Sequence, residues 1–342
     1  MKKKVGVLMI QLGTPDSPKV SDVRSYLSEF LNDKRVIDLP WLGRKLLVNG
    51  IIVPFRAPKS AKVYKELWEH GKGESPLLTY SKSIVDQLNE RLNKENIFVH
   101  LGMRYKNPHI VDALIEMRKQ NYEEIIVFPL FPQYASATNG SAIEEAMRVI
   151  KNWWVVPNMK IISQFWDHPG YIDQFVENAK KFDLKSYDHI CFSYHGLPIR
   201  QVDKVYEEGL CSDHNCEHEI TDDNKFCYKA TCYGTTRLIA EKLGIEEKDY
   251  TVCFQSRLTK NWLEPYADKV VEERAKQGDK RILFFSPAFV ADCLETIIEI
   301  GEEYQEIFEE FGGEKVDLVE SCNDKVEWVN TLEQMIRTKS LS

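Results

Sequence analysis

The sequence predicts an α/β protein made of two similar, Rossmann-like domains, each with a four-stranded parallel sheet flanked by helices. Eight apolar, strand-like runs occur, four in each half, and helical patterns separate them, which is the alternation typical of parallel sheets. The two halves also resemble each other, since each opens with a strand that ends in a Gly-x-Pro turn, at Gly13 and Gly196. A chain of 342 residues with 43% hydrophobic residues can fill two such cores.

The element order follows from the positions of these runs. We expect strands at residues 4–12, 97–103, 124–130 and 160–165 in the first half, and at 188–194, 250–255, 281–286 and 315–320 in the second. The first domain then covers residues 1–165 and the second covers 166–324, with the join near Trp166. A last helix, within residues 325–342, can pack back on the first domain.

Composition argues against several classes of protein. The formal net charge is −8, so the chain lacks the basic footprint of a nucleic-acid-binding protein. The longest apolar runs are too short for a membrane span, and the start of the chain lacks the pattern of a secretory leader. The eight cysteines then indicate thiol or metal chemistry in a reducing cytoplasm. Gly-rich nucleotide motifs are missing after the strands, which argues against dinucleotide and NTP chemistry.

A histidine stands at the end of an expected central strand. The apolar run 188–192 leads to His195, which leaves the carboxyl end of the strand, where open α/β sheets bind ligands. Later in the chain, the strand at 281–286 ends in a loop that leads to Glu295. A lone histidine in this place is more often structural. A histidine and a glutamate on neighbouring strand ends, however, form a site that can move protons or bind a metal.

The helix after that loop carries a row of acidic side chains. Glu295, Glu299, Glu302 and Glu303 are spaced i, i+4, i+7 and i+8, which places them on one face of an α-helix. A solvated acidic face is the ordinary explanation. Because like charges at this spacing repel each other, the alternative is a row that conducts protons outward or divalent cations inward.

Aromatic, basic and hydroxyl side chains follow other expected strands and suit a flat, apolar ligand that carries carboxylates. Arg104, Tyr105, Tyr134 and Trp262 are among them, although each taken singly is more often a packing residue. Residues 40–56 are apolar on most sides and have basic residues along them. This segment is either a buried helix or an exposed lip that grips an apolar substrate or rests on a membrane surface.

Four cysteines form a separate array with the spacing C-x4-C-x10-C-x4-C, at Cys211, Cys216, Cys227 and Cys232. Their polar surroundings are not those of a core, so metal or cluster binding is the expected role. Four thiolates suit either tetrahedral Zn²⁺ or an iron–sulfur cluster, and the wide x4 spacings favour the cluster. In the alternative arrangement Cys232 belongs to the core and a histidine, His214 or His218, replaces it.

Taken together, these motifs resemble those of the ferrochelatase family. The motifs occur in order along nearly the whole chain: Leu12-Gly13-Thr14-Pro15, Gly73-Glu74-Ser75-Pro76, Arg104-Tyr105, Pro132-Gln133-Tyr134, Ser193-Tyr194-His195-Gly196-Leu197-Pro198, Gln255-Ser256 and Phe289-x-x-Asp292-x-x-Glu295-Thr296. The resemblance implies a class II chelatase fold with two similar domains flanking a porphyrin cleft. It also implies a lyase that inserts Fe²⁺ into protoporphyrin IX, giving haem and two protons.

The resemblance implies roles for individual residues. His195 matches the family's catalytic histidine, Glu295 its partner carboxylate, and Glu299 and Glu302 the acidic relay behind it, so these four are expected to handle Fe²⁺. The porphyrin-binding residues are expected to be Leu12, Arg56, Ser75, Arg104, Tyr105, Tyr134 and Trp262. Some bacterial members resemble this chain in carrying a [2Fe–2S] cluster on internal cysteines, which favours that cluster, with Zn²⁺ as the alternative, at Cys211, Cys216, Cys227 and Cys232.

Two positions depart from the family pattern. Cys293 stands where many relatives carry a second histidine, so a role for that histidine does not transfer. Leu12 stands where the coproporphyrin-using branch tends to have tyrosine, which favours protoporphyrin IX as substrate. The alternatives are a chelatase for another metal or tetrapyrrole, such as cobalt or coproporphyrin, and a non-catalytic haem or porphyrin sensor. We expect a cytoplasmic protein that can touch a membrane surface through residues 40–56.

Overall fold

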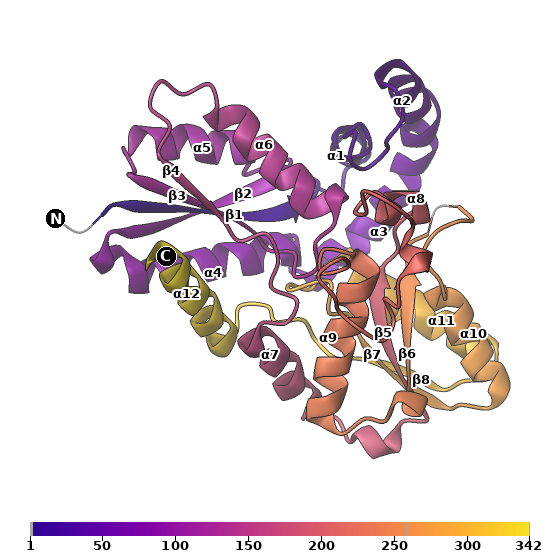
Figure 1. The fold of residues 1–342 in the computed structure, drawn as a ribbon. Helices are drawn as coiled ribbons and strands as arrows, with labels where there is room; N and C mark the ends of the chain where they lie inside the picture. Colours follow the sequence, from indigo (N-terminus) through magenta and orange to yellow (C-terminus); the bar gives the residue numbers. More distant parts are fainter. Residues whose placement is uncertain (1–2, 258, 342) are drawn as a thin grey trace. The chain divides into compact units, whose positions relative to one another are not determined.

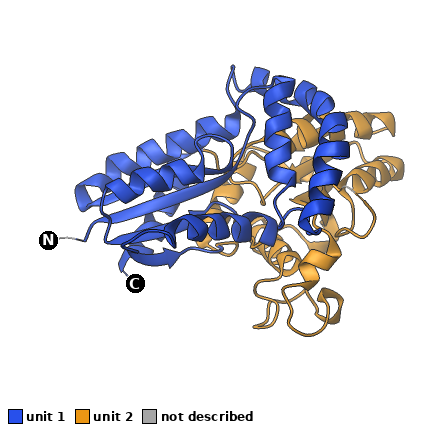
Figure 2. Cartoon of the chain, turned by 90° about the horizontal axis from the view of Figure 1, so that it is seen from above, with its two compact units in different colours: residues 1–131, 136–164, 324–342 blue, residues 132–135, 165–323 orange. Residues whose placement is uncertain are grey.

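The computed structural model describes residues 3–257 and 259–341, and every strand expected from the sequence is present (Figure 1). Packing divides the chain into two compact units (Figure 2). Unit 1 consists of residues 1–131, 136–164 and 324–342, and unit 2 consists of residues 132–135 and 165–323. Each unit is built around one four-stranded sheet.

The sheet of unit 1 is entirely parallel, with strand order β2-β1-β3-β4. Its strands are β1 (Val5–Gly13), β2 (Ile97–Tyr105), β3 (Glu124–Pro129) and β4 (Asn158–Ile161). β4 begins slightly before the expected range of 160–165 and already ends at Ile161. It ends early because Pro129 offers no N–H group to extend the ladder between β3 and β4. The central strands are buried on both faces, as a parallel sheet covered by helices requires.

Helices cover both faces of this sheet. α5 and α6 lie on one face and α4 and α12 on the other (Figure 1). The last helix, α12, therefore belongs to unit 1 and packs on α4 and β3. The helices of unit 1 are α1 (Val20–Leu31), α2 (Trp41–Leu47), η1 (Val48–Ile52), α3 (Val53–His70), α4 (Pro76–Leu92), η2 (Asn93–Glu95), α5 (Ile110–Lys119), η3 (Ser136–Gly140), α6 (Ser141–Ile150) and α12 (Val326–Leu341).

The sheet of unit 2 repeats this topology, with strand order β6-β5-β7-β8 and parallel pairing throughout. Its strands are β5 (His189–His195), β6 (Tyr250–Gln255), β7 (Arg281–Phe285) and β8 (Lys315–Leu318). α7 and α9 lie on one side of it and α10 and α11 on the other (Figure 1). The helices are α7 (Pro169–Ala179), η4 (Leu184–Ser186), α8 (Ile199–Asp203), η5 (Cys211–Asp213), α9 (Tyr228–Leu243), η6 (Glu247–Asp249), α10 (Ala267–Gln277), η7 (Glu295–Glu303) and α11 (Tyr304–Glu310).

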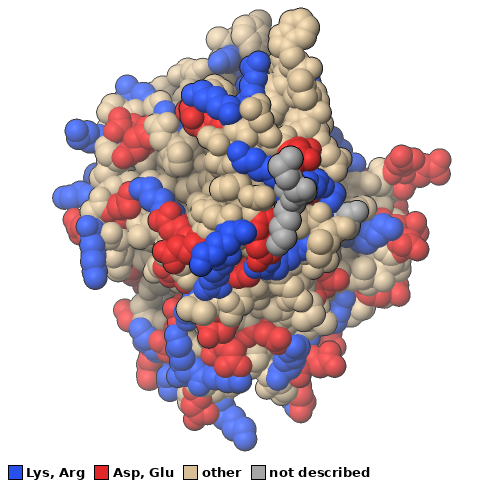
Figure 3. Space-filling model, turned by 90° about the vertical axis from the view of Figure 1, so that its left-hand side faces the viewer, with Lys and Arg blue, Asp and Glu red and all other residues tan. Residues whose placement is uncertain are grey.

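The segment 40–56 forms α2, the π-helix η1 and the start of α3, and it is not buried. Trp41, Leu46 and Phe55 are 65%, 65% and 75% exposed, so the interpretation of this segment as a buried core helix is wrong. Figure 3 shows another face of the molecule, where acidic and basic side chains are interspersed around a mostly uncharged central area. None of the helices in the described part of the chain is long and apolar enough to cross a membrane.

Candidate active site and cysteine group

His195 is the last residue of β5, which lies between β6 and β7 in the middle of the sheet of unit 2. Its Nδ1 atom is 2.7 Å from the carbonyl oxygen of Gly196. A carbonyl oxygen can only accept, so Nδ1 carries the proton in this bond, and in the neutral ring the lone pair is on Nε2. The loop conformation therefore leaves His195 with a proton-accepting or metal-binding nitrogen at the carboxyl edge of the sheet.

Glu299 lies in η7 and receives four hydrogen bonds from its surroundings. Its Oε1 accepts from the backbone N–H of Ser256 at 3.0 Å and from the Tyr304 hydroxyl at 3.1 Å. Its Oε2 accepts from Ser256 Oγ at 2.6 Å and from Gln255 Nε2 at 3.0 Å. Because a carboxylate offers about four lone-pair sites, this arrangement leaves no open ligand position for Fe²⁺. In this conformation Glu299 anchors the helix, which differs from its expected role as a metal-handling residue.

Gln255 ties β5, β6 and η7 together beside His195. Its side chain is 1% exposed, its Oε1 accepts from Ser193 Oγ at 2.7 Å, and its Nε2 also donates to the backbone oxygen of Glu295 at 3.1 Å. Ser256 follows with φ 61°, a left-handed conformation that directs its N–H toward Glu299. The start of η7, and with it Glu295, is thus held against the end of β6, the strand next to the one that ends in His195.

The acidic row lies on a π-helix and not on the expected α-helix. A π-helix closes its hydrogen bonds from i to i+5, so each turn holds more residues than an α turn. The four-residue separation of Glu295 and Glu299 is still close to one turn, whereas the seven residues from Glu295 to Glu302 make roughly a turn and a half. The prediction that Glu302 shares a face with Glu295 and Glu299 is therefore wrong.

Cys293 occupies a buried position two residues before Glu295. Burial raises the pKa of its thiol well above the usual range, and the nearby Glu295 carboxylate raises it further. The backbone N–H of Cys293 donates to Thr296 Oγ1 at 2.9 Å, and the same hydroxyl contacts the Cys293 carbonyl oxygen at 3.2 Å. Cys293 is therefore a neutral thiol beside Glu295 and cannot act as the base that a histidine could be at this position.

Two aromatic residues expected to bind the porphyrin lie in unit 2. Trp262 packs beside Gly196, where an added Cβ would come within 3.3 Å of the indole ring. Its chain neighbour Leu263 donates a backbone hydrogen bond to the carbonyl oxygen of Leu197 at 2.9 Å, which joins this loop to the one that follows His195. Tyr134 is only partly buried, and its ring meets that of Phe226 edge-on at 6.2 Å.

Arg104 and Tyr105 end β2 in unit 1 and converge on one carboxylate. Asp33 Oδ2 accepts from Arg104 at 2.7 Å, from the Tyr105 hydroxyl at 2.9 Å and from Ser141 Oγ at 2.5 Å. Burial of Asp33 raises its pKa, but these bonds, the N–H of Arg35 and the Arg104 charge outweigh that effect and hold it below the usual range. Arg104 also lines an open pocket of about 560 Å³ between α1 and α2.

The other expected porphyrin contacts in unit 1 differ in exposure. Tyr105 and Ser75 are 0% and 1% exposed, so in this structure they offer almost no surface to a ligand. The expectation that both residues bind the porphyrin stays a prediction. Leu12 is partly exposed near the end of β1, and Arg56 is exposed on α3, so these two remain available to a ligand of unit 1.

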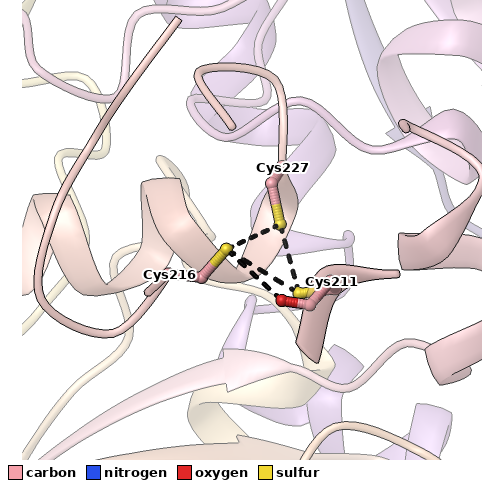
Figure 4. Close-up of side chains that lie close together, drawn as sticks. All are labelled: Cys211, Cys216 and Cys227. Carbon is pink, nitrogen blue, oxygen red and sulfur yellow. Dashed lines mark hydrogen bonds between the residues drawn. The ribbon is translucent and has the colours of Figure 1, made fainter. Parts of the chain in front are cut away.

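Three of the four arrayed cysteines form a group in unit 2 (Figure 4). Cys211 Sγ is 3.8 Å from Cys216 Sγ and 3.6 Å from Cys227 Sγ, and the last two are 3.9 Å apart. Hydrogen bonds from Cys211 and Cys227 lower the pKa of the Cys216 thiol. Cys232 lies within α9, fully buried, and is not a member of the group, so its expected part as the fourth ligand stays a prediction. His214 is stacked on Tyr206 at 4.2 Å, and Tyr206 lies 3.2 Å from Cys216 Sγ.

Comparison with known proteins decides the family. The sequence model described as Ferrochelatase matches residues 4–340. The chain belongs to the ferrochelatase family. Ferrochelatase from Legionella pneumophila (strain Lens) is 42% identical over 332 residues, covering 97% of this chain and 98% of the relative. Ferrochelatase from Coxiella burnetii (strain Dugway 5J108-111) is 42% identical over 344 residues, covering 99% and 94%.

Solved structures support the same fold. SirB from Bacillus subtilis with Fe³⁺ superposes with a TM-score of 0.56 at 12% identity, covering 98% of this chain and 95% of SirB. The sirohydrochlorin chelatase SirB from Bacillus subtilis subspecies spizizenii in complex with cobalt gives a TM-score of 0.50 at 11% identity, covering 99% and 96%. At this identity the likeness concerns the fold alone, and it confirms the predicted class II chelatase architecture.

Several residues of this ferrochelatase-family site were not found by sequence reasoning. Asp33, Ser141 and Tyr304 stand outside the quoted motifs, yet they complete the Arg104 and Glu299 networks. Tyr228 donates to the backbone oxygen of His195 at 3.0 Å. Bonds to backbone atoms, or between residues far apart in the chain, leave no periodic signal in a single sequence.

Proposed function

We propose that this chain inserts Fe²⁺ into protoporphyrin IX and releases two protons, which is the last step of haem synthesis. The observation that carries the proposal is the His195 side chain, whose Nε2 lone pair is left open by the bond from Nδ1 to Gly196. Metal insertion requires the removal of two pyrrole N–H protons, which needs a base at the macrocycle. Membership of the ferrochelatase family supports the choice of reaction.

Within this proposal, His195 accepts a pyrrole proton and Glu295 accepts the second or receives Fe²⁺. Glu299 holds η7 in place, and Gln255 fixes the start of that helix against the strand. In unit 1 the proposed porphyrin contacts are Leu12, Arg56 and Arg104. In unit 2 they are Tyr134 and Trp262. Leu12 favours protoporphyrin IX over coproporphyrin.

Anaerobic turnover tests the proposal. Purified protein with Fe²⁺ and protoporphyrin IX should form haem, and His195→Ala and Glu295→Gln should each lower kcat by about 10²–10⁴-fold, the usual contribution of an acid–base group. His70→Ala and Glu306→Gln, at exposed positions on α3 and α11, should retain the wild-type rate. Tight porphyrin binding without turnover would favour a sensor, and turnover only with Co²⁺ or coproporphyrin would select another chelatase.

The cysteine group supports a metal centre of its own. Three buried thiols with sulfur atoms within 4.8 Å of one another fit three of the four ligands that either a [2Fe–2S] cluster or Zn²⁺ takes. We propose the [2Fe–2S] cluster, with Zn²⁺ as the alternative and with Cys232 or His214 as the fourth ligand. When bound, such a group cross-links the loop that carries Cys211 and Cys216 to the start of α9.

Metal analysis and visible absorbance distinguish these occupants. Anaerobically purified protein should contain iron and inorganic sulfide and be reddish-brown, whereas a colourless protein with one equivalent of Zn²⁺ would select the alternative. Cys216→Ser should lose the metal and lower the melting temperature. Cys191→Ser, which changes a buried cysteine of β5 outside the group, should keep it. Retention of the full metal content by Cys216→Ser would contradict the proposal.

The exposed apolar side chains of α2, η1 and α3 support contact with a membrane surface. Trp41, Leu42 and Leu46 are more than half exposed, and Lys45 and Arg56 lie on the same segment. The double change Trp41→Ser and Leu46→Ser should weaken co-sedimentation with vesicles of anionic and zwitterionic phospholipid by at least about tenfold. Trp154→Ser removes a tryptophan that is 95% exposed on the loop before β4 and should have no effect. Equal weakening by both variants would count against this segment as the contact.

A further inference from the structure

One hydrogen bond connects the cysteine group to the candidate base. The Tyr228 hydroxyl donates to the backbone carbonyl oxygen of His195 at 3.0 Å. Tyr228 is the first residue of α9, and Cys227 is the residue immediately before it. A single peptide bond and one buried aromatic ring therefore separate a member of the thiol group from the backbone of His195.

The contact is rigid at both ends. Tyr228 is 6% exposed, and its hydroxyl also interacts with the buried thiol of Cys232, one turn further along α9. At the other end, the loop after β5 is fixed by the backbone N–H of Gly196, which donates to Gln255 at 2.8 Å. A displacement of the first turn of α9 would thus move the His195 carbonyl group or break its hydrogen bond.

The loop before α9 buries few side chains, and on its surface Arg237 and Lys229 of α9 contact Glu217. Among residues 204–226, only Cys211, Cys216 and Asn224 are buried. Cys211 and Cys216 are thiols of the group. Asn224 contacts the group, since its Nδ2 atom lies 3.6 Å from Cys216 Sγ. Because the loop has no apolar core of its own, a group bound to the thiols adds the main buried constraint on the loop and on the position of Cys227.

We propose that Tyr228 is a positioning residue that makes the geometry of His195 depend on occupancy of the cysteine group. A bound metal fixes Cys227 and the start of α9, and the Tyr228 hydroxyl then holds the His195 carbonyl group so that Nδ1 reaches Gly196 and Nε2 faces the substrate. Loss of the metal releases the loop and loosens His195. The catalytic meaning of this coupling rests on the proposed function, but the coupling itself does not.

Hydrogen exchange measures the coupling without reference to turnover. The protein is stripped with a chelator, and amide exchange in the 195–198 segment is compared before and after addition of one equivalent of Zn²⁺. Zn²⁺ should slow exchange by about fivefold, the effect expected for one buried hydrogen bond. Tyr228→Phe should abolish this response, and Cys216→Ser should abolish it by removing a thiol of the group. Tyr233→Phe, a matched change on α9, should respond like the wild type.

Two further readouts separate positioning from general stability. The ¹⁵N shifts of the His195 ring should change on Zn²⁺ binding in the wild type and not in Tyr228→Phe. In steady state, Tyr228→Phe should lower kcat while leaving KM for the porphyrin unchanged, since the ring makes no proposed substrate contact.

The outcomes are distinct. A Zn²⁺ response that survives in Tyr228→Phe, a wild-type segment that does not respond, or absence of Zn²⁺ binding would each overturn the coupling. A response that follows the variants as expected, in a protein that forms no haem, would leave the coupling standing and overturn only the proposed function.

Discussion

At the residue scale, Asp33 organises the carboxyl end of β2 in unit 1. Its side chain is 6% exposed and accepts hydrogen bonds from Arg104, Tyr105 and Ser141. Although burial raises the pKa of Asp33, the sum of these bonds and of the Arg104 charge lowers it below the usual value. The ionised form is therefore favoured by folding, so this carboxylate contributes stability above the pKa of the unfolded chain.

Asp33→Asn should lower the free energy of unfolding by about 1–3 kcal/mol at pH 7, because buried donors lose a charged acceptor. The wild-type advantage should shrink as the pH falls from about 4 through the lower folded-state pKa, where Asp33 itself becomes protonated. Urea unfolding at pH 7 and pH 3 checks this. Asp86→Asn, on the exposed side of α4, should change little at either pH. An equal loss at both pH values would show that charge is not the cause.

At this scale the sequence indicates the proposed reacting groups more readily than the residues that support them. His195 and Glu295 can be proposed because strand ends at one edge of a parallel sheet carry ligand-binding groups. Gln255 was recognised only as part of a motif, and its role in joining Ser193 to η7 follows from side chains brought together by folding. The bond from the Tyr105 hydroxyl to Asp33 is likewise not visible in the sequence, because a tyrosine after a strand can meet either a ligand or a buried carboxylate.

At the element scale, α9 packs so closely against its neighbours that the replacement of a glycine by alanine should destabilise the protein. In an open helix the same change stabilises. An added Cβ at Gly234 would lie 2.7 Å from Trp166 Cζ3. Gly234→Ala should therefore destabilise the protein by about 1–3 kcal/mol through overpacking. Gly43→Ala is the matched control, because α2 leaves open space around Gly43, and there the same change should stabilise by roughly 0.5–1 kcal/mol. Thermal unfolding of both variants measures the signs, and two shifts in the same direction would contradict the packing argument.

The expected elements differ from the observed ones where hydrogen bonding, not hydrophobicity, sets the structure. Buried runs such as 250–255 predicted their strands closely, because a parallel strand covered on both faces is continuously apolar. The sequence predicts an α-helix where the structure has the π-helix η7, since the side chains that η7 buries, Thr296, Ile298 and Ile300, do not indicate the hydrogen-bond register. The bonds from Ser256 and Gln255 to Glu299, which accompany that register, come from a strand far away in sequence.

At the scale of the whole molecule, the repeated topology was predictable and the path of the chain was less so. Each sheet has the order second-first-third-fourth in its own strands, and the Gly-x-Pro turns after β1 and β5 mark the equivalent positions. The assignment of residues 132–135 to unit 2 is not visible in the sequence, because it depends on contacts such as that of Gln133 Nε2 with Thr235 Oγ1 at 2.9 Å. A local sequence pattern indicates that a residue is buried, but it does not indicate which distant segment of the chain covers that residue.

The return of the chain to unit 1 makes that unit depend on its last helix. Trp328, Leu332 and Ile336 of α12 are fully buried, and Asp324 accepts from Ser83 of α4 at 2.6 Å. Trp328→Ala should lower the free energy of unfolding by about 3–5 kcal/mol, a large part of the roughly 5–15 kcal/mol that holds a domain together. Removal of residues 324–342 should leave unit 1 unfolded or insoluble, because it exposes the whole apolar face that α12 covers. Glu327→Ala, on the exposed side of the same helix, should stay within about 0.5 kcal/mol of the wild type in urea unfolding. A soluble, cooperatively folded chain ending at residue 323 would show instead that α4 and β3 are stable without this cover.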